Sequence, residues 1–341
     1  IDMSNSTRLM MMGAAGASAD KIYVDDVFST FLYDGTGSTQ SINNGIDLSG
    51  KGGAVILKKR STGAGTIWTD TARGANKHLR SDNSNQEYTE TNILTAFNSN
   101  GFSIGNEGDV NASGQTFASW TFRKAPGFFD VVTYTGNGAV QNISHSLGSI
   151  PGMIIVKNLT TAANWETYHR STGATKKLEL NETSAAGTNS GTWNNTEPTS
   201  SVFTVGTNNS SNGANYVAYI FAHDDQSFGT DSDESIIKCG TYAGNGSSGQ
   251  IINLGFEAQW LMIKSYTRGG GGYGWTMVDM MRDRALFADE NGQESGVHGY
   301  IPSPNGIHLT NGDSNVNESG ESYIYMAIRR PHKPPTAATE V

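Results

Sequence analysis

The sequence has little of what stabilises or targets many other proteins. Its single cysteine, Cys239, excludes a disulfide framework within the chain. We expect Cys239 to be a buried, inert thiol, because it stands in an apparent strand with no other Cys or His close by in the sequence. No apolar run approaches the roughly 18–20 residues that a membrane-spanning helix needs. Only 16% of the residues are charged, and the net charge of −9 is spread along the chain. Nothing therefore favours nucleic acid as a partner.

The residues that are abundant indicate a β protein. The chain contains 42 glycines, and Asn, Ser and Thr supply much of the remainder, while apolar residues make up 36%. This composition is typical of many short strands joined by Gly, Asn and Ser turns, and it argues against helix bundles. With 341 residues, the chain is long enough for three small domains, each with its own core.

A threefold internal repeat is the strongest pattern in the sequence. A Tyr-x-Gly-x-Gly turn begins at Tyr33, Tyr134 and Tyr242, so the copies are 101 and 108 residues apart. Each turn is followed by an apolar run that ends in a lysine, and these lysines are Lys58, Lys157 and Lys264. Each copy closes on a predicted strand, over residues 117–122, 216–221 and 323–328. We interpret the turn as the hairpin that starts each copy.

The predicted fold is all-β, with three tandem β-sandwich repeats of about 100 residues each, of jelly-roll or lectin-like type. Two stacked sheets are expected because a single sheet with one wet face would leave the run 154–156 half exposed. Residues 89–97 are the one stretch where a turn or two of helix is expected. The predicted divisions are a connector at 1–21, repeats at 22–126, 127–225 and 235–330, an open acidic linker at 226–234 and a proline-rich exit at 331–341.

Two residue types recur near one position of each copy and are candidates for glycan contact. The tryptophans Trp68, Trp165 and Trp275 could stack on a pyranose face. A fixed position in every copy fits a core residue better than a ligand contact. The arginines that follow them, Arg73, Arg170 and Arg282, could bind a carboxylate of an acidic glycan or tie a loop to its own repeat, through Asp70, Glu166 or Asp279.

Catalytic and metal-binding patterns are weaker. Glycoside hydrolysis needs two converging carboxylates, and the candidates Glu87, Glu182 and Glu294 occur once per copy, which favours a structural role. The acidic runs 223–225 and 231–234 lack the spacing of a metal site, and a solvated linker is the simpler interpretation. No cofactor is expected.

Three phrases of the sequence carry a resemblance to a known family. Residues 23–53, 128–157 and 323–341 are similar to the tandem repeats of tail-fibre proteins of marine bacteriophages, of the cyanophage and podovirus-like type. The resemblance extends from about residue 21 to residue 341. It implies a virion structural protein in a tail fibre or appendage, located on the extracellular phage particle, with no catalytic residues. It also implies a homotrimer and contacts with other tail or capsid proteins.

The expected function is therefore attachment to the host surface, with host glycan as a possible ligand and with neither nucleic acid nor membrane insertion. A tandem array of similar domains suits an extracellular rod or adhesin whose weak sites add up. Two alternatives remain open: a capsid-decorating or tail-hub-associated protein, and a glycan depolymerase. We expect no enzymatic activity.

Overall fold

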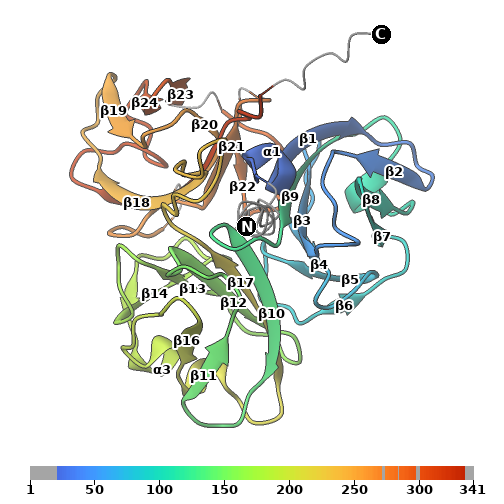
Figure 1. Cartoon of the computed structure of the whole chain (residues 1–341), viewed down its shortest axis with the longest axis horizontal. Coiled ribbons are helices and arrows are strands. Elements are labelled where there is room, and N and C mark those ends of the chain that lie inside the picture. The colour runs from blue at the N-terminus through green and yellow to red at the C-terminus, as the bar shows by residue number, and fades with distance from the viewer. Residues whose placement is uncertain (1–20, 271–272, 283, 297–299, 335–341) are drawn as a thin grey trace, which may run out of the picture.

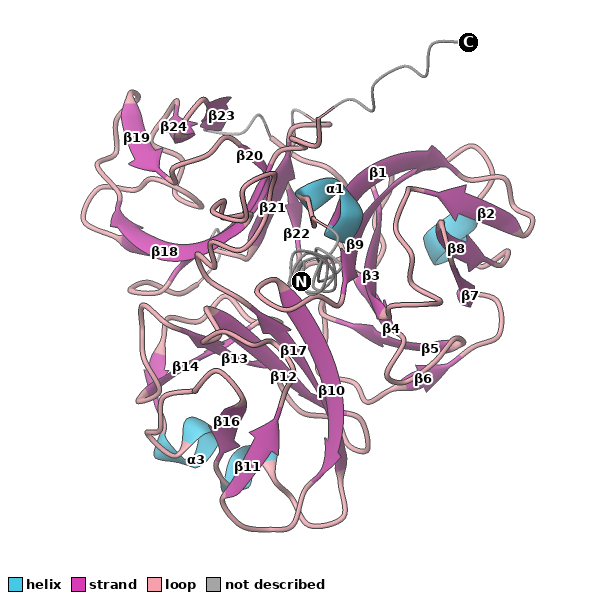
Figure 2. Ribbon diagram, in the orientation of Figure 1, coloured by secondary structure: helices cyan, strands magenta, loops and turns pink. Residues whose placement is uncertain are grey.

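The computed structural model describes residues 21–270, 273–282, 284–296 and 300–334. Nearly all of its elements are strands, and they fall into three consecutive units. The units lie as three lobes around a common centre (Figure 1). The few helices are single turns beside the strands (Figure 2), and no helix in the described ranges is long and apolar enough to cross a membrane.

Unit 1 comprises nine strands and two short helices. Its strands are β1 (Phe28–Asp34), β2 (Gln40–Asn43), β3 (Gly53–Lys59), β4 (Ile67–Asp70), β5 (Lys77–Arg80), β6 (Tyr88–Thr89), β7 (Leu94–Asn98), β8 (Gly101–Ile104) and β9 (Thr116–Arg123). Its helices are α1 (Val24–Val27) and α2 (Gly108–Asn111). The expected helix over residues 89–97 is wrong, because this segment contributes to strands β6 and β7.

Units 2 and 3 repeat the scheme with small variations. Unit 2 contains β10 (Phe129–Thr135), β11 (Gln141–Ser144), β12 (Met153–Asn158), β13 (Glu166–His169), β14 (Lys176–Glu179), β15 (Gly187–Thr188), α3 (Ser190–Trp193), β16 (Val202–Val205), the 3-10 turn η1 (Thr207–Asn209) and β17 (Asn215–Phe221). Unit 3 contains β18 (Ile237–Ala243), β19 (Gln250–Asn253), β20 (Ala258–Ser265), β21 (Thr276–Asp279), β22 (Leu286–Phe287), β23 (Tyr300–Ser303), β24 (Gly306–Leu309) and β25 (Ser322–Arg329).

Each unit has one large antiparallel sheet with the same strand order. The orders are β1-β9-β3-β4-β5-β6 in unit 1, β10-β17-β12-β13-β14-β15 in unit 2 and β18-β25-β20-β21-β22 in unit 3. In every case the first strand of the unit pairs with its last, and the last pairs with the apolar strand that ends near the repeated lysine. A second, smaller sheet accompanies each large one: β2-β8-β7, β11-β16 and β19-β24-β23. The predicted all-β sandwich architecture is confirmed.

The large sheets are buried on both faces, which explains their apolar central strands. In unit 1, Val55 and Leu57 of β3 pack with residues of the small sheet, such as Phe102, in a core between the two sheets. Their neighbours Ala54 and Ile56 belong to a different cluster at the centre of the molecule. Because successive strand residues point to opposite faces, every residue of β3 is buried.

The central cluster joins all three units. It includes Trp68 of unit 1, Tyr219 of unit 2 and Trp260 of unit 3, together with Phe28 and Cys239, all with 2% or less of their surface exposed. The units therefore share a central core in addition to the separate cores between the sheets of units 1 and 3, whereas the sequence predicted only a core within each domain. The expected burial of the Cys239 thiol is confirmed.

The Tyr-x-Gly-x-Gly turn connects the two sheets of a sandwich and is not a hairpin, because β1 pairs with β9 and β2 pairs with β8. In unit 2 a Cβ on Gly136 would lie 2.3 Å from the carbonyl oxygen of Ser211, so no larger residue fits there. Gly138 has a φ of +80°, which favours glycine. The Tyr134 hydroxyl donates to the carbonyl of Asn209, at 2.8 Å. The motif thus holds the connection between the two sheets in contact with the segment that precedes the last strand of the unit.

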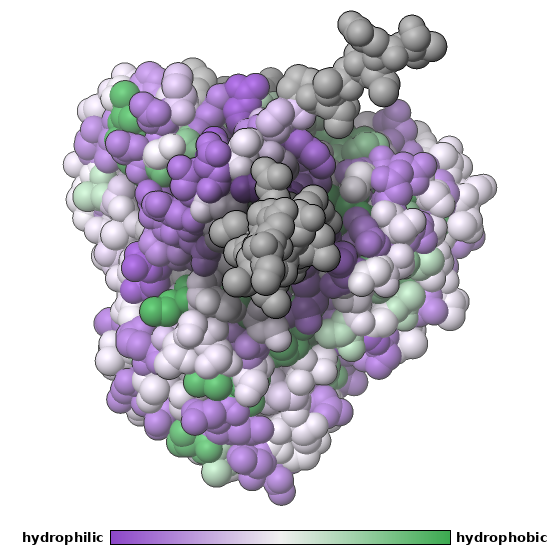
Figure 3. Space-filling model, viewed as in Figure 1, coloured by the Kyte–Doolittle hydropathy of each residue, from purple (hydrophilic) through white to green (hydrophobic). Residues whose placement is uncertain are grey.

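The joins between units are packed. In the segment predicted as an open acidic linker, Phe228 is 1% exposed and forms a β-bridge with Glu234. The start of the proline-rich exit turns back on α1, where the Lys333 ammonium lies 2.7 Å from Asp26. The predicted connector lies, apart from residue 21, outside the described residues, as do residues 335–341. The face of the molecule in Figure 3 is mostly hydrophilic, with apolar residues in small scattered groups.

Candidate functional site

Strand pairing identifies equivalent positions in the three units. Asp70, His169 and Asp279 end β4, β13 and β21, and each pairs with the first part of the neighbouring apolar strand, at Ala54, Met153 and Trp260. The residues four positions before these three are Thr66, Trp165 and Trp275, so they are equivalent. Trp68 lies two positions after Thr66, and its equivalents in units 2 and 3 are Thr167 and Met277. The three tryptophans therefore do not share one structural position.

All three indoles are buried at 1% exposure or less, so none offers a face to a sugar. The Trp165 Nε1–H of unit 2 donates to the carbonyls of Arg80 and Asn83 in unit 1, at 3.2 and 3.1 Å. The Trp275 Nε1–H of unit 3 donates to the carbonyl of Glu179 in unit 2, at 2.9 Å. These residues pack at the contacts between units, as the core alternative predicts.

The contacts between units run in one direction around the molecule. The Thr66 hydroxyl of unit 1 donates to the carbonyl of Phe287 in unit 3, at the position equivalent to the acceptors of Trp165 and Trp275. Backbone amides cross the same three contacts but donate in the opposite direction. The amide of Glu87 donates to the carbonyl of Leu159, that of Ala186 to Tyr266 and that of Glu294 to Arg60. A head-to-tail contact that repeats and returns to its start forms a closed ring. One chain thus forms a complete ring of three units.

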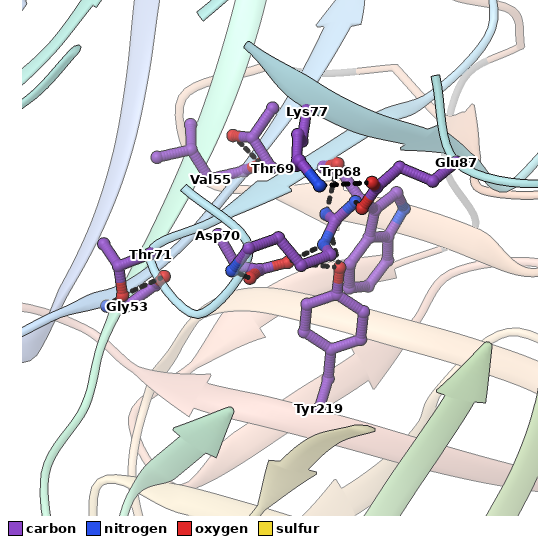
Figure 4. A network of polar contacts seen from close by, with 10 residues as sticks. Gly53, Val55, Trp68, Thr69, Asp70, Thr71, Lys77, Glu87 and Tyr219 are labelled. Carbon is purple, nitrogen blue, oxygen red and sulfur yellow. Dashed lines mark hydrogen bonds and ion pairs between the residues drawn. The ribbon is translucent and has the colours of Figure 1, made fainter. Parts of the chain in front are cut away.

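Figure 4 shows a polar network between units 1 and 2 that includes Asp70, Glu87 and Tyr219. The Arg73 guanidinium lies 2.6 Å from Asp70 and 3.4 Å from Glu87, and its Nη2–H donates to the Trp68 carbonyl at 3.0 Å. The Tyr219 hydroxyl of unit 2 donates to Asp70 Oδ2 at 2.9 Å. Burial alone would lower the pKa of Arg73, but Asp70, Tyr219 and Glu87 together outweigh it and the pKa is raised. The guanidinium is therefore a fixed charge that is paired within unit 1 and also donates to the Tyr219 hydroxyl of unit 2, at 3.0 Å.

Unit 3 contains a related network and unit 2 a different one. The Arg282 guanidinium lies 2.6 Å from Asp279 and 3.0 Å from Glu294, and Asp279 accepts the Trp120 Nε1–H of unit 1 at 3.1 Å. In unit 2 the ring nitrogen Nε2 of His169 lies 3.1 Å from the Tyr325 carbonyl of unit 3. Burial lowers the pKa of His169 to about 3, so this imidazole is neutral and donates from Nε2.

The predicted arginines separate into two groups. Arg73 and Arg282 are buried and paired to the adjacent aspartates, as the structural alternative predicts. Arg170 is exposed, and it lies two residues before Thr172, which occupies the position of the other two. The structure therefore does not bring the three predicted arginines into equivalent sites.

A buried lysine crosses each contact between units. The Lys157 ammonium of unit 2 donates to the carbonyl of Ser84 in unit 1, at 3.3 Å, and the Lys264 ammonium of unit 3 donates to that of Thr183 in unit 2, at 3.1 Å. The Lys58 ammonium closes the ring on the carbonyl of Glu290 in unit 3. Burial lowers the pKa of all three to about 8. In the sequence these lysines were recognised only because they recur in each repeat. Their hydrogen bonds to the neighbouring unit could not be predicted from it.

Two pockets occupy equivalent places beside these contacts. The pocket between units 1 and 2 has a volume of about 370 Å³ and is lined by polar groups that include Arg73, Lys77, Glu87, Thr135 and Asn215. The pocket between units 2 and 3, of about 360 Å³, has the smaller residues Thr172 and Ala186 where the first has Arg73 and Glu87. The first is a polar surface recess, whereas the second has a mixed polar and apolar lining that includes Ala185 and Tyr266.

The carboxylates at the first pocket do not form a hydrolytic pair. Asp70 and Glu87 both bind Arg73, and Glu87 also lies 2.9 Å from the Lys77 ammonium. Glu182 is not the counterpart of Glu87, because Ala186 occupies that position in unit 2. Among the described residues no group of three or more His, Cys, Asp or Glu side chains could hold a metal ion.

Comparison with known proteins gives one assignment. A search of curated proteins found no match to this chain. The family described as a domain of unknown function, DUF7483, matches residues 24–331. This range includes every strand of the three units. The chain therefore belongs to the DUF7483 family.

Proposed function

We propose that this protein is a structural component of a bacteriophage particle, within a tail fibre or appendage that attaches to the host surface. The proposal rests on the similarity of residues 23–53, 128–157 and 323–341 to the repeats of marine phage tail-fibre proteins. Family membership itself assigns no function.

The observation that best supports a structural role is the closed ring of contacts between the units. The repeated tryptophans, lysines and paired arginines, which are the residues with the most binding chemistry, are used inside this ring. The arrangement gives a compact and internally cross-linked body. Such a body suits one block of a larger appendage better than a flexible string of independent domains.

Labelling of intact particles tests the location. An antibody against this chain, coupled to gold, is expected to mark the tail or its appendages in electron micrographs. Label on the capsid or at the tail hub supports the alternative of a decoration or hub-associated protein. Particles that carry no label at any site, together with absence of the chain from their protein content, would contradict a virion role.

Attachment and enzymatic activity are separated by two further assays. Purified protein is expected to bind host cells and to reduce particle adsorption in competition. Incubation with the host surface polysaccharide is expected to leave its chain length unchanged, and shortening would identify a depolymerase instead.

Assembly into homotrimers belongs to the same proposal, and only the family resemblance supports it. The mass of the purified protein in solution is the measurement that tests it. Three times the chain mass of 36.3 kDa supports a homotrimer. A particle of 36.3 kDa would show that the ring within one chain is the complete assembly.

A further inference from the structure

The surface of unit 1 beside helix α1 contains a recess with an excess of positive charge. Its volume is about 530 Å³, and five cationic side chains line it: Lys21, Lys51, Arg123, Lys124 and Lys333. Two carboxylates, Asp26 and Asp47, are the acidic groups among the lining residues. This local surplus occurs in a chain whose net charge is −9. Bulk composition therefore does not explain it.

The two carboxylates are already engaged. Asp26 binds the Lys333 ammonium with one oxygen, at 2.7 Å, and accepts the Tyr23 amide with the other, at 2.9 Å. Asp47 Oδ1 accepts the amide of Gly50, at 2.8 Å. Lys124 is paired with Asp130, at 2.7 Å. Lys124 and Lys333 are therefore the directly paired cations of the recess, while the Asp26 and Asp47 carboxylates act on Arg123 from beyond ion-pair distance.

Arg123 contains a buried donor without a partner among the described residues. Its Nε lies buried and has no hydrogen-bond partner in the part of the chain that the structure describes. No carboxylate of the described residues lies within ion-pair distance of it. A buried guanidinium N–H without an acceptor is costly, and the rest of this half-buried group can donate to an anion in the recess.

Unit 3 provides an internal comparison for this position. Arg329 is the last residue of β25 and Arg330 follows it, just as Arg123 is the last residue of β9 and Lys124 follows it. There each arginine has its own carboxylate, since Arg329 pairs with Glu234 at 3.5 Å and Arg330 with Glu257 at 2.6 Å. Glu257 accepts the backbone amide of Arg330 just as Gly52 accepts that of Lys124. Unit 1 thus has Gly52, directly after Lys51 in the sequence, where unit 3 has Glu257, and Arg123 has no ion-pair partner like the Glu234 of Arg329 in the described residues.

We propose that this recess is a binding site for a tetrahedral oxyanion, a sulfate or phosphate group, held by Arg123 and Lys51 with Lys21 at its rim. A guanidinium donates two parallel N–H groups to such an anion, and the lysine ammonium adds a point charge. The group could be a free ion or an ester on a polyanion, because both present the same oxygens. The site is independent of the virion role proposed above.

Binding is tested on the full chain with inorganic sulfate and inorganic phosphate, titrated at constant ionic strength with chloride as the balancing salt. We expect saturable binding by calorimetry, with a rise in unfolding temperature. K51Q and R123Q are each expected to weaken it about tenfold, as loss of one charged hydrogen bond does. K51R should restore it. The matched control is R330Q, which removes an exposed cation of unit 3 and should leave the affinity unchanged.

Two outcomes overturn the proposal: no saturable binding by the unaltered chain, or an equal loss in R330Q, which would show unspecific charge attraction. Lys51 is exposed, so K51Q keeps the test decisive even if R123Q fails to fold. Dextran sulfate and neutral dextran show whether the bound oxyanion is a free ion or an ester on a polymer. Binding of dextran sulfate that K51Q weakens indicates a site for sulfate esters on a polymer, whereas binding of the inorganic ions alone indicates a free-ion site.

Discussion

At the scale of single residues, the repeated motif is explained by space. The first glycine of each Tyr-x-Gly-x-Gly turn lies against a backbone carbonyl, at 2.0 Å for Gly35, 2.3 Å for Gly136 and 2.3 Å for Gly244, measured from an added Cβ. No ligand is needed to account for it. The sequence shows that these glycines recur, but it does not show the backbone contact that requires them.

Gly136→Ala is expected to destabilise the protein by about 1–3 kcal/mol, because the added methyl group forces the chain away from Ser211. Chemical denaturation followed by fluorescence measures the change. Gly187→Ala is the control, since a Cβ there meets nothing within 4 Å and its backbone suits alanine. Equal stability of the two variants would contradict the steric explanation.

Trp165→Ala is expected to destabilise the protein by about 3–5 kcal/mol, because it removes a fully buried indole and leaves a cavity at the contact with unit 1. Thermal unfolding measures the loss. Trp165→Phe retains most of the apolar volume and should lose less. A folded Trp165→Ala variant that had lost only glycan binding would show that the indole belongs to a binding site.

At the scale of elements, the last strand of one unit donates side-chain hydrogen bonds to the aspartate–arginine network of another unit. Tyr219 of β17 and Trp120 of β9 both donate to the aspartate that ends a strand of another unit. The sequence aligned the strands within each repeat correctly, because their alternation and spacing are local. It could not indicate these pairs, since each joins residues about 150 positions apart.

Tyr219→Phe is expected to destabilise the protein by about 1–2 kcal/mol, because the buried Asp70 loses a hydrogen-bond donor while Arg73 stays paired to it. Urea denaturation provides the measurement. The control is Tyr88→Phe, which removes a hydroxyl from an exposed hydrogen bond. If both variants lose equally little, the contact between units 1 and 2 does not depend on this bond.

At the scale of the whole molecule, three buried lysines make stability depend on alkaline pH. Their folded pKa of about 8 is below that of an unfolded lysine, 10.5, so the unfolded chain binds more protons between these values. Stability is then expected to rise with pH above about 8, by up to about 1.4 kcal/mol per pH unit for each lysine. Unfolding free energies from pH 7.5 to 9.5 test this. Lys157→Met should reduce the slope, and an unchanged slope would contradict the shift.

Because the three units share a central core, we expect them to unfold together. Unit 2 expressed alone, as residues 127–225, would expose the face of its large sheet that now packs at the centre. We expect this fragment to be unfolded in nuclear magnetic resonance spectra, and the full chain to unfold in a single transition. A well-dispersed spectrum from the fragment would show that the unit is stable without its neighbours.

The sequence by itself determined the all-β class, the sandwich of two sheets and the positions of the closing strands, because turn residues and alternation act over a few neighbours. It also favoured a structural role for the tryptophans, but it did not separate the buried Arg73 and Arg282 from the exposed Arg170. Only the tertiary structure decided that the units close into a ring around a shared central core. That outcome depends on complementary surfaces between units about 100 residues apart, which local periodicity does not encode. The offset of Trp68 from its apparent counterparts, the buried role of the lysines and the unpaired Arg123 follow from the same long-range packing.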